Sequence, residues 1–310
     1  MNAKSRRGAA PLFLAAALAL AVARADAGEL GKTLAPARAG GLVKTPAPSA
    51  PQYKADEIAQ REAWEKFLAA ADIIKFELIG EGVTHPWKLY LKAGEIEKKA
   101  AWKNPTAPQN WKYEIAAYRL DKLLGVNMLP PTIEREFNGK RGSLVLWVDS
   151  KMNLLKLVED NEKARREGRK EEPPLEFEQI RGRGKYTTRI WDCLIANEDR
   201  TQENILYSAD WRTLLIDHSF AFRSSAEYTD RLVYGRNGLK KYESGDLILI
   251  KQAPRDLVDK IRALDFESVQ KAVGSYLTAR EITSVLARSK ILVAEIEEMA
   301  KLIGESKFYY

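Results

Sequence analysis

Three side chains in one stretch of the sequence have the types and the order that phosphate chemistry with a metal ion requires. Asp199 is followed five residues later by Asn204, and Asp217 comes after two short apolar runs at 205–207 and 214–216. An aspartate can orient a hydroxyl group and accept its proton, while amide and carboxylate oxygens are ligands that Mg²⁺ accepts. The spacing therefore indicates a site that binds metal and transfers a phosphoryl group to a hydroxyl.

Rigid elements are expected to flank these residues. The apolar run at 187–196 predicts a helix before Asp199, and the two short apolar runs predict a hairpin that carries Asp217. The alternative is that Asp199 and Asn204 only form a turn and that Asp217 only ends a strand, because Asp and Asn are common in turns. The order and context of all three residues favour the site.

The first half of the chain predicts a small antiparallel sheet with few helices. Helical periodicity covers 54–72 and 111–124, and Gly125 marks the end of the second helix. Between and after them, short apolar runs are separated by Gly, Asn-Gly and Pro-Pro. The expected strands cover residues 73–80, 87–93, 98–103, 133–135 and 143–148.

Beyond residue 177 the pattern is mainly helical. Thr278 and Glu281 form a capping-box pattern before a long amphipathic helix that runs to Leu302. Strands with one main helix, followed by helices with a small hairpin, predict an α+β fold of two lobes. The expected parts are an N-lobe with a leading helix at 53–149, a charged connection at 150–178, and a helical C-lobe at 179–310.

The region around Asp199 resembles the catalytic core of the protein-kinase-like superfamily, and its atypical branches most closely. Asp199-Arg200 followed by Asn204 is similar to the motif of phosphoinositide 3-/4-kinases and HipA-type kinases, and the phrase LIANEDR at 194–200 is similar to the secreted Golgi casein-kinase family. The resemblance implies a kinase that uses ATP with Mg²⁺ or Mn²⁺. It makes Asp199 the catalytic residue, and Asn204 and Asp217 the metal ligands.

The resemblance extends upstream to Gly80 and implies further contacts to the nucleotide. A lysine that ends the strand at 98–103 would bind phosphate, and a glutamate early in the next helix would pair with that lysine. A short glycine-containing loop would cover the phosphates, and a hinge segment would meet adenine. The residues in these positions are Gly80, Gly82, Lys103, Glu114, Leu146 and Val148.

Three features depart from the family's pattern. Thr201 stands where many relatives carry His, His218-Ser219 replaces the usual Phe-Gly, and the glycine loop is sparse. These departures remove no metal ligand, but they leave the acceptor open among a protein, a glycan, a lipid and a small molecule. A nucleotide-binding pseudokinase or scaffold and an AMP-transferring enzyme stay as alternatives. His218 itself is expected to be packed or hydrogen-bonded rather than a general base.

The N-terminus has the layout of a secretory signal peptide. Three basic residues precede an apolar run at 9–23, and small-residue cleavage patterns end at Ala25 and Ala27. Because the run is shorter than the roughly 20 residues of a spanning helix, cleavage is favoured over a membrane anchor. Residues 1–27 are thus the expected leader and 28–52 a flexible Pro- and Ala-rich linker. The mature protein is expected in the periplasm or outside the cell, without a stable membrane span.

Composition excludes several other classes of site. Cys193 is the only cysteine, so no internal disulfide can form, and one Cys with two His cannot make a Cys-rich or His-rich zinc site. The formal charge is +7, and loss of the leader removes four cations and one acid to leave +4. A charge this small does not indicate a nucleic-acid partner, but it suits an anionic ligand such as a nucleotide.

Overall fold

The computed structural model describes residues 53–80, 86–105, 109–230, 232, 240–243 and 246–310. The expected leader, the expected linker and Gly82 lie outside the described residues. The contacts of the chain divide it into Met1–Pro46 and Ala47–Tyr310, and every statement below concerns the second part. None of its described helices combines the length and the apolar character needed to cross a membrane.

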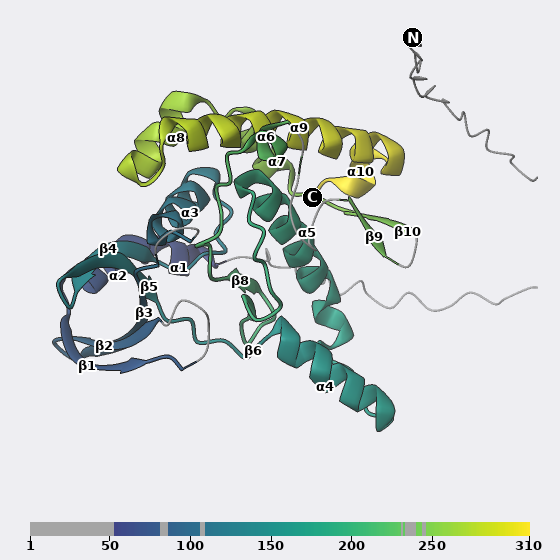
Figure 1. Ribbon diagram of the computed structural model, residues 1–310. Helices are drawn as coiled ribbons and strands as arrows, with labels where there is room; N and C mark the ends of the chain where they lie inside the picture. Colours follow the sequence, from purple (N-terminus) through teal and green to yellow (C-terminus); the bar gives the residue numbers. More distant parts are fainter. Residues whose placement is uncertain (1–52, 81–85, 106–108, 231, 233–239, 244–245) are drawn as a thin grey trace, which may run out of the picture. The chain divides into compact units, whose positions relative to one another are not determined.

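Five antiparallel strands form the sheet of the first lobe, as predicted (Figure 1). In spatial order they are β1 (Asp72–Leu78), β2 (Trp87–Ala93), β3 (Ile96–Lys103), β5 (Lys140–Leu146) and β4 (Thr132–Phe137). Successive side chains of a strand point to opposite faces of the sheet. Trp102 therefore enters an apolar cluster on one face, whereas Lys103 reaches ion-pair partners on the other.

Three helices accompany this sheet, and they are α1 (Ala55–Ala59), α2 (Arg61–Ala70) and α3 (Trp111–Leu124). From α2, Phe67 and Leu68 join the apolar cluster that contains Trp102. Helix α3 contacts β4 and β5 on one side and α8 (Phe266–Val273) of the second lobe on the other. It thus lies where the two lobes meet.

The ends of α3 follow from local chemistry. The side-chain oxygen of Asn110 accepts a hydrogen bond from the backbone N–H of Lys112, which caps the start of the helix. Gly125 ends it in a left-handed conformation with φ of 68°, which glycine adopts without steric cost. The predicted bounds 111–124 are confirmed. The helix predicted at 54–72 instead divides at Gln60 into α1 and α2.

The second lobe is mainly helical and contains the larger apolar core. Its helices are α4 (Leu154–Arg166), η1 (Leu175–Phe177), α5 (Glu178–Ile195), α6 (Ala226–Thr229), α7 (Arg255–Arg262), α8, η2 (Gly274–Tyr276), α9 (Ala279–Ile303) and α10 (Glu305–Phe308). Its strands are β6 (Met152–Asn153), β7 (Ile205–Tyr207), β8 (Thr213–Leu215), β9 (Lys240–Glu243) and β10 (Asp246–Leu249). Buried Trp191, Leu194 and Ile195 of α5 lie in this core.

One helix begins earlier than the sequence-based expectation. Helix α5 begins at Glu178, nine residues before the predicted start at 187, because its first turns carry charged residues and two glycines that hide the apolar period. The segment 150–178, expected as a charged connection, contains β6 and the whole of α4.

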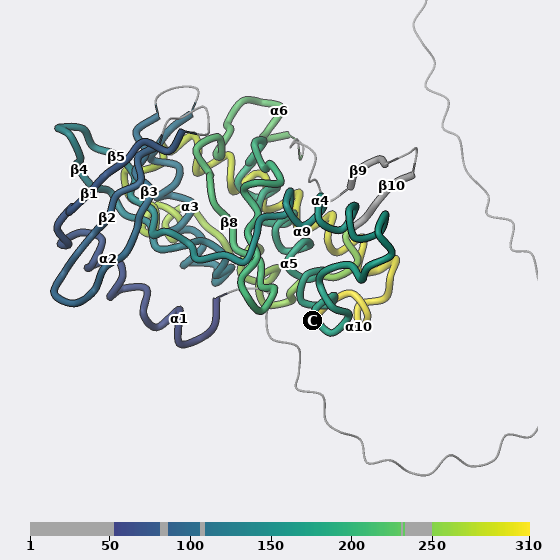
Figure 2. Tube along the Cα trace, turned by 90° about the horizontal axis from the view of Figure 1, so that it is seen from below, coloured from purple at the N-terminus to yellow at the C-terminus, as the bar shows by residue number. Residues whose placement is uncertain are grey.

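The chain passes from one lobe to the other just after β5. The backbone N–H of Trp147 donates to the carbonyl of Lys99 in β3, and the N–H of Lys151 donates to the carbonyl of Tyr207 in β7. The segment 147–151 thus joins the first sheet to the small sheet β6-β7-β8. In Figure 2 the strands of the first sheet lie on the left, helices α4 and α5 lie on the right, and β8 lies between them.

Candidate active site

A buried lysine is held by two carboxylates where β3, α3 and the end of β8 meet. The Nζ atom of Lys103 lies 2.9 Å from Oε1 of Glu114 and 3.0 Å from Oδ1 of Asp217. The side chains of Lys103 and Glu114 are only 11% and 4% exposed, whereas that of Asp217 is 27% exposed. The ion pair that the resemblance implied between Lys103 and Glu114 is confirmed.

The charges of this group stabilise one another. Burial alone would raise the pKa of Glu114, but Lys103 and then His218 outweigh it and hold that pKa below its usual range. Burial alone would lower the pKa of Lys103, but Glu114 and Asp217 outweigh it and raise that pKa. Both groups therefore stay ionised at neutral pH, and their opposite charges offset the cost of burying them.

Asp217 lies on a bend that turns its carboxylate toward Lys103. Its φ of +59° is in the left-handed region, which is uncommon for a residue other than Gly or Asn. The hydroxyl of Ser219 donates to Oδ1 of Asp217 at 3.0 Å, and the N–H of Asn110 donates to the carbonyl of Ser219 at 2.9 Å. The start of α3 thus holds the bend in place, and such a conformation is a common feature of functional sites.

The loop between α5 and β7 brings Asp199 and Asn204 beside Asp217. The N–H of Ile216, just before Asp217, donates to the carbonyl of Asn204 at 3.2 Å, and Nδ2 of Asn204 lies 3.4 Å from the carbonyl of Asp199. Burial raises the pKa of Asp199, and the negative charge of Asp217 raises it further. Asp199 is exposed, so the three residues of the predicted motif meet at an open face.

Arg200 anchors this loop to α5 and to the end of β8. It was not among the site residues predicted from the sequence. Its guanidinium lies within 3.0 Å of both carboxylate oxygens of Asp192 in α5. It also donates to the carbonyls of Asn204 at 3.1 Å and Ile216 at 2.6 Å. A sequence signal did exist, because Asp192 interrupts the apolar stretch of α5 and a buried carboxylate needs a partner.

Not every predicted residue joins this group. Gly80 lies in a bend after β1, and no atom of the described residues lies within 4 Å of where its Cβ would be; Gly82 is outside the described residues. Leu146 pairs with Ala100 in β3, and the alternation of the strand puts both on the face opposite to Lys103. Ala101 and its partner Val145 share the face of Lys103. Counting residues in steps of two from Lys103 could have found Ala101, whereas Val145 requires the register between β3 and β5. 

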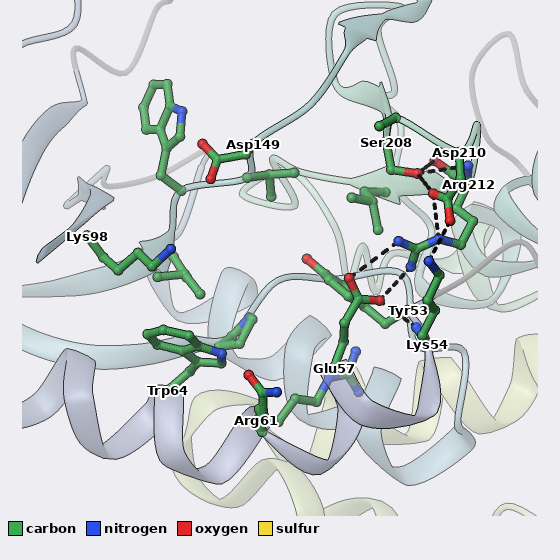
Figure 3. A pocket seen from close by; sticks show the side chains of 17 residues that line it. Tyr53, Lys54, Glu57, Arg61, Trp64, Lys98, Asp149, Ser208, Asp210 and Arg212 are labelled. Carbon is green, nitrogen blue, oxygen red and sulfur yellow. Dashed lines mark hydrogen bonds and ion pairs between the residues drawn. The ribbon is translucent and has the colours of Figure 1, made fainter. Parts of the chain in front are cut away.

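Leu146 and Val148 line a different cavity, which lies between α1, α2, the segment after β5 and the turn between β7 and β8 (Figure 3). It encloses about 640 Å³, and none of Lys103, Asp199, Asn204 or Asp217 lines it. Its walls are tied together by ion pairs from Arg212 to Glu57 at 2.6 Å and from Lys54 to Asp210 at 2.9 Å. These pairs fasten the leading helix α1 to the second lobe.

The side-chain oxygens of the motif suit a hard divalent cation. Asp217 Oδ1 already interacts with Lys103 and Ser219, but across the described residues no hydrogen bond or ion pair engages Asp217 Oδ2 or Asn204 Oδ1. Carboxylate and amide oxygens are the donors that Mg²⁺ and Mn²⁺ take in proteins. No cluster of three or more His, Cys, Asp or Glu that could hold a metal occurs in the described part.

Comparison with known proteins gives structural likeness only. No protein-family model matches the chain, and no curated protein sequence matches it. The structure of hydra Fam20 with sugar superposes with a TM-score of 0.56 at 14% identity, over 84% of this chain and 95% of that one. The Helicobacter pylori proinflammatory kinase CtkA gives a TM-score of 0.45 at 12% identity, over 77% and 98% of the two chains. The chain has the predicted α+β, two-lobed, protein-kinase-like fold.

Proposed function

We propose that this protein is a phosphotransferase that moves the γ-phosphoryl group of ATP to a hydroxyl, using Mg²⁺ or Mn²⁺. The observation that carries the proposal is the buried Lys103 ammonium held between Glu114 and Asp217, with Asp199 and Asn204 on the adjacent loop. A cation fixed by two acids, next to further oxygen donors on an open face, is suited to a metal-bound triphosphate.

Lys103 is the proposed phosphate ligand and Glu114 its support. An ammonium group carries three N–H donors, and the carboxylate of Glu114 fixes its direction. Gly80 and Gly82 are the proposed loop over the phosphates. The adenine ring is proposed to contact the main chain of residues 146–148, which includes Leu146 and Val148. It would also contact the side chains of Ala101 and Val145, which share the Lys103 face of the sheet.

Asn204 and Asp217 would hold the metal ion through Asn204 Oδ1 and Asp217 Oδ2. When bound, the metal supplies positive charge to the phosphate oxygens. Asp199 is the proposed base: the acceptor hydroxyl gives its proton to the carboxylate while its oxygen forms a bond to the γ-phosphorus. The bond from that phosphorus to the oxygen it shares with the β-phosphate breaks, and ADP leaves. The raised pKa of Asp199 makes it a better proton acceptor than an ordinary aspartate.

The proposed division of the chain into lobes and segments is the one predicted from the sequence. Residues 53–149 form the N-lobe with its leading helix, 150–178 the connection, and 179–310 the C-lobe. Residues 1–27 are the proposed leader of an exported protein, followed by the linker at 28–52. The proposed partners are the nucleotide and a hydroxyl-bearing acceptor, with no nucleic acid.

The fate of labelled ATP tests the proposal. Protein lacking residues 1–27 is incubated with Mg²⁺ or Mn²⁺ and ATP labelled at either the α- or the γ-phosphate, with casein, a sugar and a phosphoinositide as acceptors. Transfer of the γ-label to an acceptor or to the protein itself, dependent on metal, is the expected result. Transfer of the α-label would indicate AMP transfer instead. Nucleotide binding without any transfer would indicate a pseudokinase.

A further inference from the structure

We propose that His218 is a positioning residue that links the Asp199–Asn204 loop to Glu114 and so fixes Lys103. The proposal assigns a role to the residue that stands where the family's pattern has Phe. The link between the loop and Glu114 can be tested without a ligand. The expected effect of His218 on nucleotide binding rests on the proposed function.

His218 is surrounded by polar groups, although the family's pattern has the apolar ring of Phe at this position. The residue is 1% exposed. Its Nε2 lies 2.9 Å from Nη2 of Arg200, and Nε1 of Trp191 donates to the same atom at 3.3 Å. Trp191 belongs to α5 and Arg200 to the loop that follows it, so the imidazole contacts both the helix and the loop of the motif.

The identity of these neighbours fixes the state of the ring. An arginine guanidinium and an indole N–H can donate hydrogen bonds but cannot accept them. Nε2 must therefore present its lone pair, which leaves the proton on Nδ1 and the ring neutral.

The other side of His218 faces Glu114. The backbone N–H of His218 donates to Oε2 of Glu114 at 3.0 Å, and Nδ1 lies 3.7 Å from the same oxygen. Oε1 of Glu114 is bound by Lys103 at 2.9 Å. The two carboxylate oxygens thus have separate partners, one in the bend at 217–219 and one in β3.

A continuous path of buried polar contacts results. It runs from Asp192 in α5 to Arg200, from Arg200 to His218, from His218 to Glu114, and from Glu114 to Lys103. The same Arg200 guanidinium also holds the carbonyls beside both proposed metal ligands. His218 thus connects the loop to α3, because its side chain contacts Arg200 and its backbone N–H contacts Glu114.

A phenylalanine at this position would fill a similar volume but would offer no acceptor. The N–H groups of Trp191 and Arg200 that point at Nε2 would lose this acceptor, and a buried donor without its acceptor destabilises the folded state. Glutamine can place its amide oxygen near the position of Nε2. His218→Phe and His218→Gln are thus a matched pair that differ in the acceptor.

The first measurement needs no nucleotide. Amide hydrogen exchange of the leaderless protein is compared among wild type, His218→Phe and His218→Gln, each checked for folding by circular dichroism and thermal unfolding. His218→Phe is expected to speed exchange of the amides donating within the first turns of α3, by about tenfold for each 1.4 kcal/mol of lost restraint. His218→Gln is expected to restore most of the protection. Unchanged exchange in folded His218→Phe would overturn the proposal.

The second measurement is calorimetry with a nonhydrolysable ATP analogue and Mg²⁺. The loss in His218→Phe is expected to be about 10- to 100-fold in affinity, as for other residues that orient a ligand-binding group, and His218→Gln should recover it. Equal analogue affinity of wild type and both variants would contradict this part. Absence of binding by wild type would instead count against the proposed function, while hydrogen exchange still decides the role of His218. If His218→Phe does not fold, hydrogen exchange and analogue affinity are compared between His218→Gln and His218→Ala instead, which also differ in the acceptor.

Discussion

Individual charges in this protein are distinguished by how deeply they are buried. Glu114 is almost fully enclosed and is bound by Lys103, whereas Asp217 is partly exposed and shares one oxygen with Lys103 and Ser219. The first is suited to orienting the lysine and the second to meeting a ligand. This difference explains why the two acids are proposed for different tasks.

A second buried acid, Asp121, allows the effect of burial on a pKa to be tested through the pH dependence of stability. Its carboxylate is fully buried and pairs with Arg61 at 3.1 Å, and it accepts from the N–H groups of Met128 and Leu129. Burial raises its pKa to about 6, although Arg61 opposes the shift. An acid whose pKa is raised in the folded state adds stability below its unfolded pKa and loses that contribution as pH rises through the folded value.

Asp121→Asn is expected to remove this pH dependence. Wild type should lose stability relative to the variant between about pH 4 and pH 6, at up to about 1.4 kcal/mol per pH unit, the value for one proton. Urea unfolding across that range measures the difference in the free energy of unfolding between the two proteins. The contributions of the other titrating groups cancel in this difference. Parallel curves for the two proteins would show that the pKa of Asp121 is not raised.

Much of the candidate site could be predicted at the residue scale. Asp199, Asn204 and Asp217 follow from residue type and spacing, and the pairing of Lys103 with Glu114 was implied by the resemblance to the protein-kinase-like superfamily. The face occupied by Leu146 and the roles of Arg200 and His218 could not be predicted in the same way. They depend on strand register and on contacts between residues far apart in the sequence.

At the scale of elements, capping chemistry made some bounds predictable. Helix α3 begins after Asn110 and ends before Gly125, and α9 begins after Thr278, the N-cap of the capping box with Glu281, as the sequence indicates. The start of α5 was missed because tertiary burial, rather than local periodicity, stabilises its charged first turns. The helices α1 and α2 matter beyond their own lobe, since they contact the end of α3 and the second lobe.

Arg61 is expected to be the main tie between α2 and the end of α3. It is 4% exposed, pairs with Asp121, and donates to the side chain of Asn127 at 2.8 Å and the carbonyl of Leu129 at 3.2 Å. Arg61→Met should lower the free energy of unfolding by about 3–5 kcal/mol, because Asp121 is left buried without its counter-charge.

The matched control is Lys66→Met, which removes one cation from an exposed position of the same helix. It should change the free energy of unfolding by no more than about 0.5 kcal/mol. Denaturant unfolding of both variants measures the two values. Equal effects of the two substitutions would rule out a special contribution from the Arg61–Asp121 pair.

At the scale of the whole molecule, the two lobes are joined by more than the chain itself. Lys103 and Asp217 connect β3 to the second lobe at the candidate site, and Glu57 and Arg212 connect α1 to it at the cavity of Figure 3. Ion pairs thus lie at two separate places between the lobes. The two-lobed α+β fold was predictable because the order of strands and helices is local information in the sequence, whereas its protein-kinase-like character was implied by the resemblance of the region around Asp199.

The export of the protein is a prediction at this scale too. The basic start, the short apolar run and the small-residue cleavage patterns predict that the mature protein begins near Asp26 or Gly28. N-terminal sequencing of protein taken from each cell fraction of its native host measures this. Intact Met1 on protein from the cytoplasm would contradict the prediction.

The central claim is that Asp199 and Asp217 belong to one phosphotransfer site and act differently in it. Calorimetry with a nonhydrolysable ATP analogue and Mg²⁺, run beside an ATP-consumption assay on wild type, Asp199→Ala and Asp217→Ala, tests it most directly. Asp217→Ala should weaken analogue binding by about 10- to 100-fold, because a proposed metal ligand is lost. Asp199→Ala should leave binding within about threefold but lower turnover by about 10²- to 10⁴-fold, the usual contribution of a general base. Unchanged binding and turnover in both variants of an active wild-type protein would contradict the account.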